Sequence, residues 1–131
     1  MNKKLDKILA EISAGELIDK ITILEIKKIK IRNEEKLKEV EKELLSLNDT
    51  LKKTIPDKSK IQTLIDKLKT INLKLWDIEN GKRLAEKNSD FGEKFIELAR
   101  SVYKTNDERS KLKLEINNIL GSNIKEVKSH Y

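Results

Sequence analysis

A group of polar side chains suited to binding recurs within residues 97–116, which read ELARSVYKTNDERSKLKLEI. Its members are three residues apart, so each neighbours the next on a helix: Arg100, Tyr103, Asn106 and Arg109. A guanidinium group binds phosphate or carboxylate through paired hydrogen bonds, while a tyrosine ring stacks and an amide orients a ligand. This pattern predicts a polar ridge that holds a small anion.

The ridge interrupts an apolar seam of the same helix. The apolar members of that seam are Phe95, Leu98, Val102, Leu112, Ile116 and Ile119. Thr105 and Arg109 fall on the same seam, so Arg109 is expected to face another helix. A buried charge without a partner costs on the order of several kcal/mol, so Arg109 needs a carboxylate or a bound anion.

Charged partners for Arg109 are expected on a helix that begins near residue 13. The candidates are Glu16, Asp19, Lys20, Glu25 and Lys28. One interpretation is an ion pair, of the type Arg109 with Glu25, that fixes helix register while Tyr103 donates to a carbonyl. The other is an anion pocket, and the residues that this helix adds to the ridge are then Glu16, Lys20 and Lys28. The pocket predicts binding or sequestration of a small anion such as a nucleotide derivative.

Signals for catalysis are sparse, and the sequence favours a binding protein without metal or cofactor over an enzyme. Cysteine is absent, His130 is the only histidine, and no glycine-rich phosphate loop is present. Glu16 and Asp19 lie three residues apart, but carboxylates at a helix start ordinarily stabilise the helix dipole. One enzyme alternative remains, because residues 18–21 (IDKI) are similar to the first helix of all-helical chorismate mutases. The arginine expected early in that helix is missing.

The composition suits narrow-striped helices better than a thick core. Of 131 residues, 37% are hydrophobic and 40% are charged, so part of the burial is expected from homo-oligomerisation. The net charge of +6 is spread over interleaved Lys and Glu, which leaves nucleic-acid binding possible but not favoured. No apolar run is long enough for a membrane span and no signal peptide is recognisable, so a cytoplasmic protein is expected.

Capping and breaking residues divide the chain into helices. Ser13 to Glu16 is typical of a capping box, and Asn33 suits the start of a second helix or a kink, giving one long helix or a kinked pair over 13–53. Pro56 marks the clearest break, after which 57–87 forms the second arm of an antiparallel hairpin. The heptad pattern from Leu37 to Ile78 also suits a coiled-coil dimer seam or a protein partner.

The last helix is expected over 90–120. A second capping box, Asp90 to Glu93, precedes it and Gly121 ends it. The tail, 121–131, alternates loosely and suits a short strand paired with residues 8–12. The sequence therefore predicts a single all-α domain over 1–131, a helical bundle with a long hairpin and a minor two-stranded element from the termini.

Three blocks of the sequence resemble a known family. They are GELIDKITILEIK at 15–27, LWxIE at 75–79, and FGxxFxxLARSVYxTND at 91–107 followed by LGS at 120–122, where x marks a position outside the motif. Together they are similar to an uncharacterised domain family of small helical proteins from bacteria and their phages. The resemblance implies a mostly helical, stand-alone cytoplasmic protein and assigns no reaction or residue roles.

Overall fold

The computed structural model describes residues 4–128, and these form four helices. They are α1 (Ala14–Lys30), α2 (Glu34–Thr54), α3 (Gln62–Lys87) and α4 (Glu93–Leu120). The predicted all-α bundle is confirmed. The described part of the chain contains no strand, so the two-stranded element expected from the termini is not formed there. His130 lies outside the described residues.

Local side-chain chemistry sets most of the helix boundaries. The Ser13 hydroxyl accepts from the Glu16 N–H at 3.1 Å, and Asn33 caps α2 by accepting from the Lys36 N–H at 3.0 Å. Gly121 ends α4 with a φ of +66°, a left-handed conformation that favours glycine. The second predicted capping box was wrong. The N-cap of α4 is Gly92, which has no side chain to cap the helix. Asp90, the residue expected to cap it, instead accepts from the Gly92 N–H at 3.3 Å.

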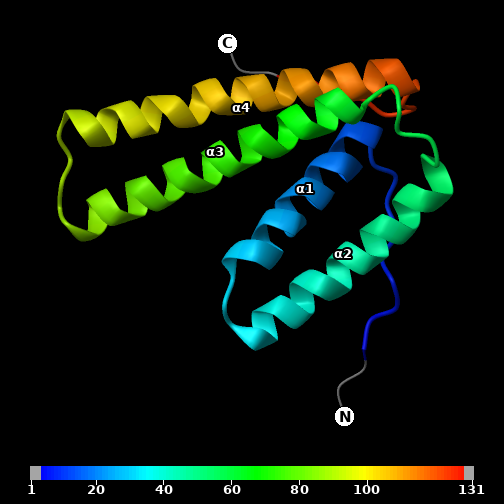
Figure 1. The fold of residues 1–131 in the computed structure, drawn as a ribbon, viewed down its shortest axis with the longest axis horizontal. Coiled ribbons are helices and arrows are strands. Elements are labelled where there is room, and N and C mark those ends of the chain that lie inside the picture. The colour runs from blue at the N-terminus through cyan, green and yellow to red at the C-terminus, as the bar shows by residue number, and fades with distance from the viewer. Residues whose placement is uncertain (1–3, 129–131) are drawn as a thin grey trace.

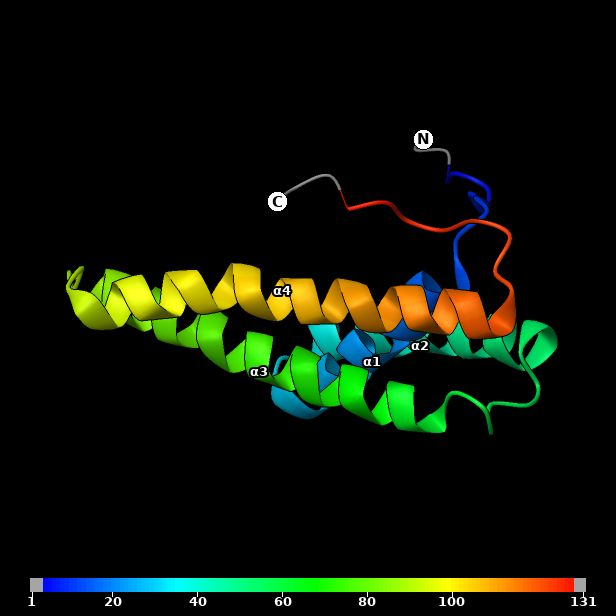
Figure 2. The same cartoon turned by 90° about the horizontal axis from the view of Figure 1, so that it is seen from above.

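The helices pair as α1 with α2 and α3 with α4, and α1 also packs on both α3 and α4 (Figures 1 and 2). Pro56 breaks the chain as predicted, but the helices that flank it do not pair along their length, and only Leu51 and Ile55 at the end of α2 reach the cluster that holds α3. The hairpin predicted across Pro56 was therefore wrong, and the long hairpin is α3–α4. A heptad stripe requires an apolar partner but does not specify which helix supplies it.

The wide apolar face of α1 explains this arrangement. One side of α1 joins α2 in a first cluster, made of Leu17, Ile21, Leu24, Val40 and Leu44. Its other side joins α3 and α4 in a second cluster, made of Ile18, Ile61, Leu64, Leu68 and Ile116. The predicted seam of α4 is buried at Thr105 and Ile116, but Ile119 is 48% exposed.

The α3–α4 hairpin extends beyond the region that α1 covers, because α1 diverges from α3 toward its own C-terminal end (Figure 1). In the part of the hairpin that projects, large apolar side chains remain exposed, namely Leu84, Phe91 and Ile96. There the two helices pack only on each other, as where Leu98 lies beside Gly81. No helix within residues 4–128 has the length and apolar character of a membrane span.

The two terminal segments leave on the same side of the helices (Figure 2). The Ser122 hydroxyl accepts from the Ala14 N–H at 3.1 Å, and Asn123 donates to the Glu11 carboxylate at 2.5 Å. Side-chain hydrogen bonds therefore join the start of α1 to the residues that follow α4.

Candidate functional site

The polar break in the α4 seam is an ion pair between Arg109 and Asp19 of α1. Asp19 is fully buried, whereas the Arg109 side chain is 28% exposed. Arg109 Nε lies 3.0 and 3.1 Å from the two Asp19 carboxylate oxygens, and Nη2 donates to Oδ2. These hydrogen bonds outweigh the effect of burial and raise the pKa of Arg109 above its ordinary value. Arg109 therefore faces α1 and pairs with a carboxylate, as its place on the apolar seam predicted, although its side chain is only partly buried.

Asn72 of α3 completes the coordination of the Asp19 carboxylate. Its amide nitrogen donates to Asp19 Oδ1 at 2.9 Å and to the Thr22 hydroxyl at 2.8 Å. Thr22 in turn donates to the Asp19 carbonyl at 2.8 Å. On the other side, Arg109 Nη1 donates to Asn106 Oδ1 at 3.5 Å. One buried carboxylate thus ties α1 to both α3 and α4.

Lys113 forms a second ionic centre one helical turn along α4. Its side chain is 12% exposed, and its Nζ lies 2.6 Å from Glu16 and 3.0 Å from Glu126. Burial acts to lower the pKa of Lys113, but hydrogen bonds to Glu16 and Glu126 outweigh it and the pKa is raised. Burial likewise acts to raise the pKa of Glu16, but its hydrogen bond with Lys113 and other favourable contacts outweigh it and the pKa is lowered.

The ion pair of Glu16 with Lys113 predicts a loss of stability in acid. The folded pKa of Glu16 is depressed, so its contribution is present above the unfolded pKa of about 4.3 and disappears as the pH falls through the folded value. We expect Glu16→Gln to show a smaller fall in melting temperature than the wild type between about pH 5 and pH 3. Equal acid slopes by circular dichroism would contradict this. Glu39→Gln serves as control, since Glu39 is exposed on α2 and makes no ion pair within the described residues.

The predicted ridge does not stay on one face of α4. Arg109 and Asn106 lie together at the junction with α1 and α3, whereas Arg100 is exposed and Tyr103 is 55% exposed. Steps of three residues fall short of a full turn by about 60° each, so three steps rotate Arg100 to the side opposite Arg109. Residues three apart on a helix are therefore neighbours, but four residues in a row at this spacing do not share one face of the helix.

The residues predicted on α1 also separate. Glu16 lies in the junction through Lys113, and within residues 4–128 the one ion-pair partner of Lys20 is Glu16, at 3.7 Å. Lys28 is exposed and makes no ion pair within the described residues. The predicted partner of Arg109 was wrong, because Glu25 lies 3.5 Å from Lys69 of α3 instead.

Asp19 was among the candidates, and the sequence held a signal that favours it. Small or polar residues recur at helical spacing on the face of α1 that α3 and α4 cover, at Gly15, Asp19 and Thr22. A buried helix face that is not apolar indicates a specific polar partner. That signal was missed because the isoleucines around it dominate the pattern.

A groove of about 620 Å³ opens beside the Arg109 ion pair, where α1 diverges from α3. We call it the Trp76 groove. Its polar and aromatic wall is formed by Asn72, Trp76, Asn80, Arg83, Asn106 and Arg109. From α1 it receives Ile23 and Lys27. Trp76, Asn80 and Arg83 recur at spacings of four and three on α3, which places them on one helix face.

The charges of the Trp76 groove are mainly positive. Among the described residues, no carboxylate lies within 4.0 Å of the Lys27 or Arg83 nitrogens. Glu79 is the one acidic residue that lines the groove, and it lies 3.6 Å from Lys82. Two cations without ion-pair partners therefore flank an aromatic ring in a concave surface.

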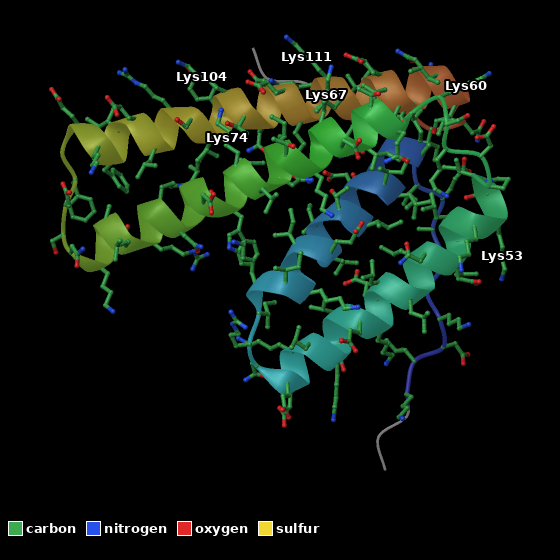
Figure 3. The ribbon with its side chains drawn as sticks, viewed as in Figure 1. Lys53, Lys60, Lys67, Lys74, Lys104 and Lys111 are labelled. Carbon is green, nitrogen blue, oxygen red and sulfur yellow. The ribbon has the colours of Figure 1, made fainter. Side chains whose placement is uncertain are left out.

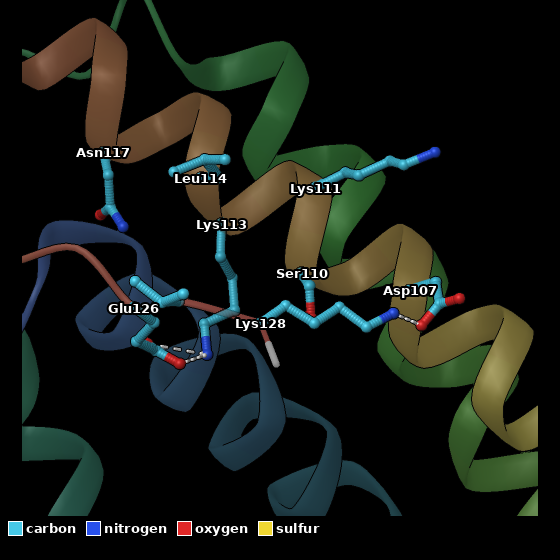
Figure 4. A pocket seen from close by; sticks show the side chains of 9 residues that line it. Asp107, Ser110, Lys111, Lys113, Leu114, Asn117, Glu126 and Lys128 are labelled. Atoms are coloured by element: carbon cyan, nitrogen blue, oxygen red, sulfur yellow. Dashed lines mark hydrogen bonds and ion pairs between the residues drawn. The ribbon is translucent and has the colours of Figure 1, made fainter. Parts of the chain in front are cut away.

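A second hollow, of about 290 Å³, lies between α4 and the C-terminal tail (Figure 4). Lys113 points to Glu126 there, and Lys128 pairs with Asp107. Carboxylates of the same chain, Glu126 and Asp107, thus neutralise two of the cations that line this hollow. These ion pairs hold the C-terminal tail against α4. Because its cations are already neutralised, this hollow is a weaker candidate for anion binding than the Trp76 groove.

The fold and the site together define a helical bundle with an ion-paired junction and a basic groove beside it. A family model matches residues 8–131, and the chain belongs to that family, which is described as a family of unknown function (DUF6165). The predicted resemblance to an uncharacterised domain family is confirmed. Neither the curated proteins nor the solved structures gave a match.

Proposed function

We propose that the protein binds a small anionic metabolite in the Trp76 groove. The observation that supports this most is that Lys27 and Arg83, which form no ion pair within residues 4–128, line the same concave surface as the aromatic ring of Trp76. Ligand sites are typically concave, of about 300–1,000 Å³, with a few polar groups that fix orientation. The volume and lining of this groove fall within that description.

Each charged wall has a distinct part in this proposal. The guanidinium of Arg83 offers a planar fork for a phosphate or carboxylate, and Lys27 adds a point charge from α1. The charge of Arg109 is already neutralised by Asp19, so this residue shapes the groove but adds little attraction for an anion. The ligand class comprises nucleotide derivatives, sugar phosphates and dicarboxylates. Arg100 and Tyr103, which do not line the groove, are left out of the proposed site.

Trp76 gives a direct test, because it is the only tryptophan in the chain. A panel of nucleotides, sugar phosphates and dicarboxylates is titrated while its fluorescence is followed. We expect at least one compound to change the emission, and Arg83→Gln to weaken its binding by about tenfold or more, since a charge-assisted hydrogen bond contributes roughly 1.5–3 kcal/mol.

Arg100→Gln is the matched control, since it removes the same charge from an exposed helix position outside the groove. It should leave the affinity within about twofold of the wild type. Equal weakening by both variants would indicate general electrostatic attraction and contradict the assignment of the groove. A panel without any response in fluorescence or melting temperature would contradict the proposal as a whole.

Nucleic acid is a less favoured partner because acidic groups lie among the lysines. Five of the six lysines labelled in Figure 3 lie along α3, the turn before it and α4, and Lys53 lies on α2. Lys67 and Lys111 flank an outer groove of α3 and α4, but Asp66, Glu108 and Glu115 line it too. Acidic groups among the lysines repel a phosphate backbone. A salt-dependent gel shift with generic DNA or RNA would favour this alternative.

Self-association remains part of the proposal. The exposed apolar side chains of the projecting hairpin, Leu84, Phe91 and Ile96, suit contact with a second copy or with another protein. Light scattering after size-exclusion chromatography distinguishes a monomer from an oligomer.

A further inference from the structure

The amide of Asn72 presents a hydrogen-bond acceptor to the Trp76 groove. Its nitrogen donates to the Asp19 carboxylate, which when ionised can only accept, so the orientation of the amide is fixed by chemistry. The residue is 5% exposed and lines the groove. No described residue donates a hydrogen bond to Asn72 Oδ1. Since every fully buried side-chain oxygen of the described residues does have a partner, this oxygen is not fully buried. We assign it to the Trp76 groove because Asn72 lines that groove.

The amide of Asn106 has the opposite polarity. Arg109 can only donate, so its contact of 3.5 Å from Nη1 favours the Asn106 oxygen on that side. The Asn106 nitrogen then remains a donor, and this residue also lines the groove. The two amides thus present opposite groups, an acceptor from Asn72 and a donor from Asn106. This pair matches a ligand edge that bears both a donor and an acceptor.

Trp76 supplies the third recognition element. Its ring is half-buried on the same wall, next to Leu75, and Ile23 of α1 lines the groove as well. A flat aromatic surface with apolar neighbours favours a planar ring over a sugar or an aliphatic diacid. Arg83 and Lys27 contribute the positive charge that an acidic substituent of that ring system requires.

We infer that the ligand of the Trp76 groove is a nucleoside monophosphate, with its base stacked on Trp76 and its phosphate at Arg83 and Lys27. The base edge bonds to the Asn72 oxygen and the Asn106 nitrogen. This inference rests on the proposed function, which requires only an anion. Nucleobases combine a planar ring with adjacent donors and acceptors, whereas sugar phosphates and dicarboxylates lack the ring.

The test compares AMP, GMP, CMP and UMP with ribose 5-phosphate, which shares their sugar and phosphate but has no base. Dissociation constants come from calorimetry, so that Trp76 variants can be measured too. We expect the best nucleotide to bind at least about tenfold more tightly than ribose 5-phosphate. Trp76→Leu should remove most of that advantage and leave ribose 5-phosphate unchanged, while Trp76→Phe should restore part of it. Asn106→Ala should weaken the nucleotide alone.

The outcomes separate the two proposals. If ribose 5-phosphate binds as tightly as every nucleotide, the inference about the base is overturned and anion binding stands. A nucleotide preference that survives in Trp76→Leu, with the variant folded by circular dichroism, also overturns it. If none of the five compounds binds, this inference fails, and the proposed function is then decided by the dicarboxylates and other sugar phosphates of the fluorescence panel.

Discussion

Arg109→Met is expected to lower the free energy of unfolding by about 3–5 kcal/mol, because it leaves a buried carboxylate without its main partner. Asp19 is fully buried, so water cannot replace the lost guanidinium hydrogen bonds. Asn72 still donates to it, but an amide does not neutralise the charge. Lys113 Nζ lies 3.9 Å from Asp19 and is already bound by two other carboxylates. Urea denaturation followed by circular dichroism measures the change.

The double variant Asp19→Leu with Arg109→Met is the matched control. Replacing both members of a buried ion pair by apolar groups is often neutral, so we expect it to recover most of the lost stability. Asp19→Leu alone should cost less than Arg109→Met, since the remaining guanidinium is 28% exposed and reaches water through the groove. An Arg109→Met protein as stable as the wild type would mean that the pair does not hold the junction together.

Gly15→Ala is expected to destabilise the protein by about 3 kcal/mol, the upper part of the usual range for overpacking. A Cβ atom at this position would lie 2.5 Å from the Lys113 carbonyl oxygen and 3.0 Å from Asn117 Oδ1. Backbone cannot rotate aside as a side chain does, so α1 must shift away from α4. The shift would also weaken the hydrogen bond from the Gly15 N–H to Asn117, now 2.6 Å.

Gly81→Ala provides the control, because both glycines lie within helices. Its Cβ would meet only the end of the Leu98 side chain, at 3.3 Å, and alanine favours a helix by up to about 1 kcal/mol. We expect a change of less than about 1 kcal/mol at Gly81 and a fall in melting temperature of roughly 10 °C at Gly15. Similar melting temperatures for the two variants would show that α1 and α4 do not approach as closely as described.

The sequence predicted the local features of this fold well because they depend on near neighbours. Ser13, Asn33 and Gly121 act at the helix ends that they were expected to cap, and Pro56 separates two helices. The pairing of helices was not predictable in the same way. The apolar stripe of α2 suits any neighbour, and its packing on α1 depends on how α1 divides its wide apolar face.

The candidate site was predicted in part. The orientation of Arg109 toward another helix followed from its position among apolar residues, and so did its need for a negative partner. The identity of that partner did not follow, because Glu16, Asp19 and Glu25 all lie on one helix whose rotation about its axis the spacing leaves open. The Trp76 groove was missed, because the divergence of α1 from α3 is a property of the assembled bundle and not of any one helix.

The projection of the α3–α4 hairpin beyond α1 divides the molecule into parts of unequal local stability. Near Arg109 three helices share a buried carboxylate, so opening there requires breaking the whole junction. Toward the turn between α3 and α4, each helix has only the other for support, and opening costs correspondingly less. The Trp76 groove has one wall at the junction and extends along α3 to Arg83. A ligand that bridges these positions would couple hairpin opening to its own release, so that residence time would depend on how often the tip opens.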